Sequence, residues 1–211
     1  TYPSDIDESQ IKLPEHLRNL THRIYKEGDN LAILEYKVSL KEIWKPIKVK
    51  FSDRDECTGK FLKKNPDITS YRYFLFSETL INKTKDLLPN LIEFLEIINI
   101  SFDKKYFFMN LLEEDIDCLT PESKIRKHPD PNIIKIMDIK KHEFYYDIIK
   151  EKHLFMIKNH SLHTYVSDVF VQKVLENNLK GFWFVPVWTL ENGGIEEPYF
   201  KSDENPDIIR T

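Results

Sequence analysis

Apolar and polar positions follow one another in several short segments, each about as long as a β-strand. Residues 47–51 (Ile-Lys-Val-Lys-Phe) alternate strictly, which is typical of a strand with one buried face. Residues 106–112 are almost wholly apolar, so we expect a central strand there. Most neighbouring strand candidates are too close for a helical crossover, so the pattern predicts an α+β fold with a largely antiparallel sheet and a few short helices. The further strand candidates are 32–36, 71–76, 94–100, 133–137, 144–149, 153–157, 164–166 and 182–187.

Two of the predicted helices share one layout. Each follows a strand that ends in a serine and an acid, Ser77-Glu78 and Ser167-Asp168, and each is followed by another strand. A serine hydroxyl accepts a hydrogen bond from a free amide at a helix start, and the acid favours the positive end of the helix dipole. We therefore predict two strand–Ser-acid–helix–strand units, with an internal duplication left open. Gly181 is expected to supply the left-handed residue after the second helix.

A third helix is predicted near the start of the chain. Ser39 and Glu42 have capping-box spacing, in which the two side chains satisfy the first free amides of a helix. Pro46 would end that helix quickly.

Charge is concentrated at the end of the chain. The 211 residues carry a net charge of −4, and residues 191–211 contain six acids and two bases, so the whole imbalance lies in that tail. We predict an N-terminal extension over 1–46 packed on the domain, an α+β domain over 47–190 and an acidic tail over 191–211. The chain begins at Thr1, not Met, and we expect that something preceding it was removed.

Composition excludes several classes of protein. A slightly acidic chain is a poor general binder of polyanions, so no nucleic-acid partner is expected. No apolar run approaches the ~18 residues of a membrane helix, so no membrane partner is expected. Two cysteines, Cys57 and Cys118, cannot form a disulfide framework and favour a reducing, cytoplasmic location.

Candidate chemistry is sparse. His160 and His163 could offer two imidazoles to a metal, but their spacing fixes no shared direction, which favours ordinary surface histidines. The acidic run 113–117 does not fit a calcium loop, because Thr120 stands where that loop needs glycine. Aromatics interleaved with bases, as at 104–108, could stack on nucleic-acid bases, but core strands explain them better. With no motif for nucleophilic, phosphate or metal chemistry, we predict no catalytic, cofactor or metal residues.

The order of the segments resembles a known family. The stretch 165–184 (Tyr-Val-Ser-Asp-Val-Phe, then Leu-Glu-Asn-Asn-Leu-Lys-Gly-Phe-Trp-Phe) is similar to the closing signature of the immunity proteins of bacterial polymorphic-toxin systems, catalogued as DUF1629-like. Residues 76–78 and 87–89 resemble the earlier Ser-acid helix of that family, and 106–110 and 115–119, followed by Ser123, resemble its central block. The similarity spans roughly residues 47–188.

The resemblance implies a cytoplasmic antitoxin in bacterial competition, which binds one cognate toxin domain and blocks it without catalysis. Ser77, Ser167 and Gly181 then have structural roles, as do the core residues Phe182 and Phe184. A hydrolase or transferase with an unrecognised site and a general protein-interaction module are the alternatives, and a homodimer is left open. Our hypothesis is that an acidic surface faces a basic toxin, against the alternative of a solvated loop and tail. Its candidate toxin-binding residues are Glu113, Glu114, Asp115, Asp117, Glu196 and Glu197.

Overall fold

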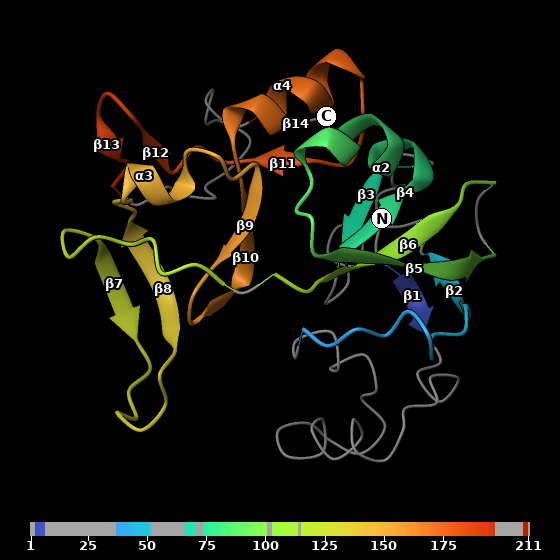
Figure 1. The fold of residues 1–211 in the computed structure, drawn as a ribbon, viewed down its shortest axis with the longest axis horizontal. Helices are drawn as coiled ribbons and strands as arrows, with labels where there is room; N and C mark the ends of the chain where they lie inside the picture. Colours follow the sequence, from blue (N-terminus) through green and yellow to red (C-terminus); the bar gives the residue numbers. More distant parts are fainter. Residues whose placement is uncertain are drawn as a thin grey trace. The chain divides into compact units, whose positions relative to one another are not determined.

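The computed structural model describes residues 3–6, 37–51, 66–70, 74–100, 103–113, 115–196 and 209–210. The chain forms two compact units, and the ribbon is shown in Figure 1. Unit 1 comprises Thr1–Glu113 and Glu176–Gly181, and unit 2 comprises Glu114–Leu175 and Phe182–Thr211. The division into an extension, a domain and an acidic tail concerns sequence segments and stays a prediction.

A six-stranded sheet forms the centre of unit 1. Its order is β1-β2-β5-β6-β4-β3, and every neighbouring pair is antiparallel except β2 and β5. The predicted α+β fold with a largely antiparallel sheet is therefore confirmed. The strands are β1 (Pro3–Ile6), β2 (Ile47–Phe51), β3 (Ile68–Ser70), β4 (Phe74–Ser77), β5 (Ile92–Asn99) and β6 (Tyr106–Leu111).

The burial of these strands follows their sequence pattern. In β2, Ile47 and Val49 are buried while Lys48 and Lys50 are exposed, as strict alternation predicts. Strand β6 lies between β5 and β4 and buries Tyr106 and Phe108 completely. The interpretation of 104–108 as core, and not as a base-stacking platform, is confirmed for these two rings.

Both strand–Ser-acid–helix–strand units form. Helix α2 (Glu78–Thr84) follows β4 and continues into the 3₁₀ turn η3 (Lys85–Leu87), and the Ser77 hydroxyl accepts from the Leu80 amide at 3.1 Å. Helix α4 (Asp168–Glu176) follows β10 (His160–Val166), and the Ser167 hydroxyl accepts from the Phe170 amide at 3.3 Å. Both predicted serine caps are confirmed.

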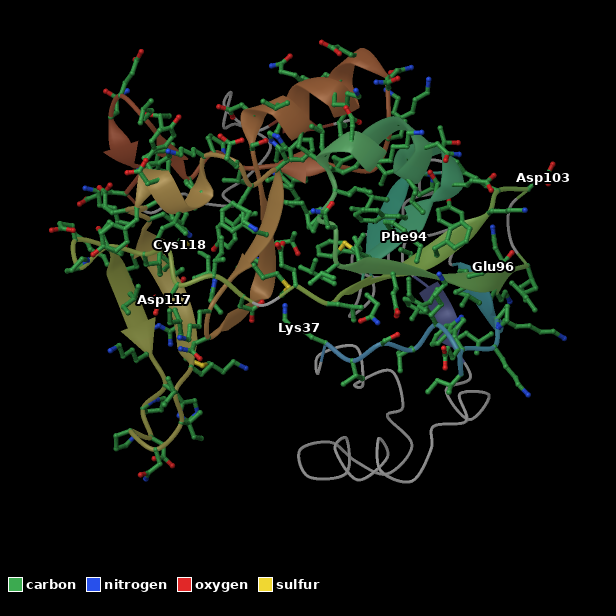
Figure 2. The ribbon with its side chains drawn as sticks, viewed as in Figure 1. Lys37, Phe94, Glu96, Asp103, Asp117 and Cys118 are labelled. Atoms are coloured by element: carbon green, nitrogen blue, oxygen red, sulfur yellow. The ribbon has the colours of Figure 1, made fainter. Side chains whose placement is uncertain are left out.

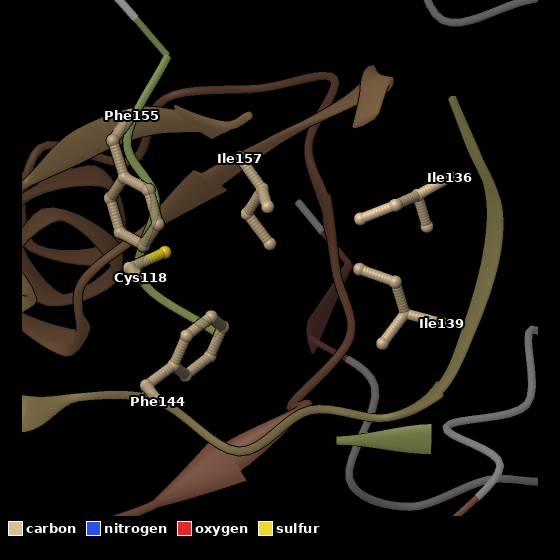
Figure 3. Close-up of a cluster of buried hydrophobic side chains, with 6 residues drawn as sticks. All are labelled: Cys118, Ile136, Ile139, Phe144, Phe155 and Ile157. Atoms are coloured by element: carbon tan, nitrogen blue, oxygen red, sulfur yellow. The ribbon is translucent and has the colours of Figure 1, made fainter. Parts of the chain in front are cut away.

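Unit 2 is built from two-stranded sheets around a small core. Figure 3 shows six buried side chains of that core: Cys118, Ile136, Ile139, Phe144, Phe155 and Ile157. Strand β8 contributes the two isoleucines at 136 and 139, and β9 contributes Phe155 and Ile157. The remaining elements are β7 (Lys124–Lys127), β8 (Ile136–Lys141), α3 (Tyr146–Ile149), β9 (Leu154–Ile157), β11 (Trp183–Phe184), β12 (Trp188–Thr189), β13 (Gly193–Gly194) and β14 (Ile209–Arg210).

A buried carboxylate organises one end of unit 1. Asp67, which is 6% exposed, accepts from the Ser77 hydroxyl at 2.8 Å and from the Lys104 ammonium at 2.5 Å. Its second oxygen accepts from the Lys180 amide at 2.8 Å. The backbone amides of Asp67 and Ile68 both donate to the Lys180 carbonyl, at 2.6 and 3.2 Å. Asp67 therefore holds the helix cap, β6 and the segment 176–181 together.

Gly181 is needed at this place for a different reason from the one predicted. Helix α4 ends at Glu176, and the left-handed residue after it is Asn178, with φ +50°. Gly181 has φ +98°, and a Cβ there would lie 2.4 Å from the Ile68 carbonyl oxygen. Close approach to β3, and not helix termination, requires the glycine.

Three other local predictions are wrong. No helix follows Ser39, because Glu93 of β5 binds both the Ser39 hydroxyl at 2.5 Å and the Leu40 amide at 2.9 Å, which leaves only a turn at 41–43. Residues 144–149 are not a strand, since Phe144 forms an isolated bridge and α3 follows. The strand expected at 182–187 is limited to two residues, and Pro186 cannot donate to a ladder. The strand candidate 32–36 lies outside the described residues.

Among the described residues, none of the helices has the length and apolar character that crossing a bilayer demands.

Replacement of Asp67 by alanine is expected to lower the free energy of unfolding by about 3 kcal/mol, because it removes the carboxylate that accepts from the Lys104 ammonium, the buried Ser77 hydroxyl and the part-buried Lys180 amide. Urea denaturation followed by circular dichroism measures the change. Asp103→Ala, at an exposed aspartate labelled in Figure 2, is the control and should change stability by less than about 0.5 kcal/mol. Equal effects of the two substitutions would contradict the role of Asp67.

Candidate functional site

Two of the predicted acidic residues lie exposed on unit 2, and each has a lysine partner. Asp117, labelled in Figure 2, has a side chain that is 78% exposed and lies 3.6 Å from the Lys158 ammonium. Glu196 is 63% exposed and pairs with Lys124 of β7, which holds the pKa of the Glu196 carboxyl below its ordinary value. Both carboxylates are accessible to a partner, but their charges are already partly balanced.

The other predicted acids differ in placement. Glu113 belongs to unit 1, is half-buried, and accepts from the Lys37 ammonium through its backbone carbonyl at 2.6 Å. Asp115 belongs to unit 2 and is also half-buried. Glu114 and Glu197 lie outside the described residues. The six positions therefore do not form one demonstrated patch, and their role in binding stays a proposal.

Histidine and tyrosine side chains form a polar cluster in unit 2, in which His142 and His160 are buried. The Tyr165 hydroxyl forms hydrogen bonds with His142 Nε2 at 2.9 Å and with His160 Nδ1 at 3.2 Å. His142 is 4% exposed and His160 is 2% exposed, and the ring centroid of His163 lies 5.2 Å from that of His160. We call these four residues the histidine–tyrosine cluster.

Burial keeps the histidines of this cluster neutral. It lowers the pKa of His142 to about 4, and the neighbouring His160 and His163 add to the effect. It also lowers the pKa of His160 to about 4, with a further contribution from His163, while Asp138 opposes and Lys135 adds to the shift. The buried Nδ1 of His142 has no hydrogen-bond partner in the described structure. Such an atom is less costly as a neutral lone pair than as a charged N–H.

The expectation that these are surface histidines is wrong for His160. In a regular strand, residues three apart point to opposite faces. In β10, however, the pairing shifts from His160 opposite Ile157 to Thr164 opposite Met156, so three residues bulge out between them. The bulge brings the rings of His160 and His163 together. Sequence spacing alone could not show this irregularity, and it gave no sign of the roles of His142 and Tyr165.

Cys118 is a core residue of unit 2. Its thiol points between the rings of Phe144 and Phe155 (Figure 3), and it is fully buried. Burial first, and the Asp117 charge to a smaller extent, raise the pKa of this thiol to about 12. A thiol with so high a pKa has little nucleophilic thiolate near neutrality. Cys57 lies outside the described residues.

Within the described ranges, no group of three or more His, Cys, Asp or Glu side chains is arranged to hold a metal ion.

A family comparison identifies the class of protein. The family model of the immunity protein family Imm11 matches residues 48–189, about two thirds of the 211 residues. The chain therefore belongs to the Imm11 immunity protein family. The resemblance expected over 47–188 is confirmed, under the family name Imm11 where we used the DUF1629-like heading. No curated protein matches the chain. Membership indicates an immunity function for the α+β chain.

The histidine–tyrosine cluster is expected to make stability depend on pH. Because the folded state disfavours protonation of His142 and His160, the unfolded state binds more protons between pH 6.5 and about 4. The stability is therefore fully present above this range and is lost as the pH falls through it. The loss is up to about 1.4 kcal/mol per pH unit for each histidine.

Urea unfolding at several pH values, from about pH 7 down to about pH 5, measures this slope. His142→Phe should flatten it. Phe155→Leu alters the ring stacked on Tyr165 and keeps every histidine, so it should lower stability without changing the slope. A wild-type slope in His142→Phe would refute the assignment.

Proposed function

We propose that this protein binds one cognate bacterial toxin domain and neutralises it by direct protein–protein interaction, inside the cytoplasm of the cell that makes both. The family match over residues 48–189 carries the proposal. Family membership also favours a role without catalysis. The only cysteine in the described structure is buried with a raised pKa, and His142 and His160 beside Tyr165 are buried in unit 2, which agrees with such a role.

Neutralisation by occupancy makes physical demands on the surface. Tight complexes of nucleases with their immunity proteins reach Kd values of roughly 10⁻¹³–10⁻¹⁶ M, and slow dissociation is what protects the cell. A standard interface of ~1,600 Å² with a few apolar anchors can supply such affinity, while charges at its rim mostly speed association.

We propose that acidic residues of this protein belong to that rim. Asp117 and Glu196 support the proposal because their side chains are 78% and 63% exposed, and their partners are lysines that a basic toxin surface can replace. The ion pairs with Lys158 and Lys124 are exposed and therefore weak, so exchanging partners costs little. Glu113, Glu114, Asp115 and Glu197 complete the proposed set.

Expression of the neighbouring reading frame tests the function directly. If that frame encodes a secreted protein with a lethal C-terminal domain, co-expression of the present chain should restore growth, and the tagged chain should co-purify with the domain. Failure of both would exclude a cognate pair and favour a general interaction module. Turnover of a substrate by the purified chain, abolished by one histidine or carboxylate substitution, would instead support the hydrolase or transferase alternative.

Charge reversal tests the acidic rim. Replacement of the six acids by lysine, beginning with the exposed pair Asp117→Lys/Glu196→Lys, should slow association with the toxin domain by about tenfold at low salt and much less at high salt. Surface plasmon resonance measures the rate. The matched control Glu42→Lys/Asp103→Lys makes the same charge change at exposed positions of unit 1 and should leave it unaltered. Identical rates for both double variants would remove the acids from the interface.

A further inference from the structure

The hairpin formed by β7 and β8 carries a charge opposite to that of the rest of the chain. Residues 124–141 contain six bases and two acids, a net charge of +4, whereas the whole chain has a net charge of −4. The other residues therefore carry −8 together. All four side chains of β7 are exposed, and three of them are Lys124, Arg126 and Lys127. Strand β7 therefore presents three bases on four exposed residues.

The two strands of the hairpin have different roles. Strand β8 buries Ile136 and Ile139 in the core of unit 2, which fixes the hairpin to that unit. Strand β7 buries none of its side chains, and it pairs only with β8 among the described strands. Charged residues on an edge strand prevent unwanted pairing with other chains, and β7 fits that purpose. Edge protection does not, however, explain the residues at the turn.

Two large apolar side chains stand at the turn of the hairpin. Ile133 is 45% exposed and Ile134 is 80% exposed, and the turn extends away from α3 and from the β12–β13 hairpin (Figure 1). An isoleucine with so much exposed surface contributes little to the core of its own protein. Lys135 directly follows the pair, and β7 of the same hairpin carries three exposed bases, so the hairpin has the composition of an interface anchor with a charged rim.

The turn is held rigid before any partner arrives. The His128 amide donates to the Lys135 carbonyl at 2.8 Å, and the Ile133 amide donates to the Asp130 carbonyl at 3.1 Å. The Asp130 carboxylate accepts from the amide and from the side chain of Asn132, at 2.9 and 3.0 Å. A segment ordered in this way loses little conformational entropy on binding, so it favours high affinity.

We propose that the β7–β8 hairpin is a docking element for an acidic surface of the toxin domain, with Ile133 and Ile134 as its apolar anchor and the bases of β7 and β8 as its rim. This inference rests on the proposed function. Two features favour a protein partner over a nucleic acid. The anchor is aliphatic and offers no ring for a base to stack on, and the other residues of the chain carry a net charge of −8, which disfavours a polyanion.

Two pairs of variants test the anchor and the rim separately. Ile133→Ser/Ile134→Ser should raise the Kd for the co-encoded toxin domain at least about tenfold, mainly through faster dissociation. Its control is Leu91→Ser/Ile100→Ser, which changes two aliphatic residues of unit 1 that are 58% and 59% exposed and should leave the Kd unchanged.

The rim is tested by charge reversal. Lys127→Glu/Lys140→Glu should slow association with the toxin domain at low salt. Lys83→Glu/Lys85→Glu makes the same charge change at exposed positions of unit 1 and should leave the association rate unchanged.

Each outcome either supports or overturns the docking role of the hairpin. If the wild-type chain binds the toxin domain and both hairpin variants bind it equally well, the docking role is overturned and the proposed function stands. If the wild-type chain does not bind the domain, the docking role of the hairpin and the proposed function are both refuted. The wild-type chain could instead retain a labelled RNA oligonucleotide or phosphatidylserine vesicles. If the same hairpin variants lose that retention while toxin binding persists, the hairpin binds that other partner and the proposal is overturned.

Discussion

The buried carboxylate of Asp67 is the constraint on which the arrangement of unit 1 depends. An ionised group inside a protein is tolerable only when its oxygens are satisfied, and here a hydroxyl, an ammonium and a backbone amide do so. Those donors come from the cap of α2, from Lys104 two residues before β6 and from the segment 176–181. Because Lys180 must reach Asp67, the chain contributes this segment to unit 1 although the residues on both sides belong to unit 2. Gly181 completes the constraint, since any side chain there would collide with β3.

Unit 2 solves the problem of buried polar groups in the opposite way. His142 and His160 share hydrogen bonds with the Tyr165 phenol, so these buried polar groups satisfy one another without an ion pair. Burial raises the pKa of the Tyr165 hydroxyl and lowers those of the histidines around it, which keeps all of them uncharged near neutrality. Asp117, Glu196 and the bases of β7 lie exposed at the surface of this unit, where they are accessible to a partner.

Sequence reasoning succeeded where neighbouring residues decide the structure. The alternation in β2, the apolar run of β6 and the serine caps of α2 and α4 depend on contacts within a few positions, and all were predicted. It failed where a distant residue decides. Glu93 accepts the hydrogen bond of the Ser39 hydroxyl, and a bulge in β10 places the His160 side chain in the interior of unit 2. For the candidate site, the exposure of Asp117 and Glu196 could be anticipated from their polar surroundings. Their lysine partners could not, since Lys124 is 72 positions away from Glu196.

A surface of mixed sign suits the proposed recognition of one toxin domain in preference to other partners. With an acidic rim alone, any basic protein would be attracted, and with a basic hairpin alone, nucleic acids would compete. When patches of both signs are fixed on one rigid unit, only a partner with the complementary arrangement gains at every contact, and a misaligned one brings like charges together. The ion pair between Lys124 of β7 and Glu196 joins the two proposed patches, so in the free protein each sign partly neutralises the other. Discrimination then arises from the geometry of the charges and not from the net charge of −4.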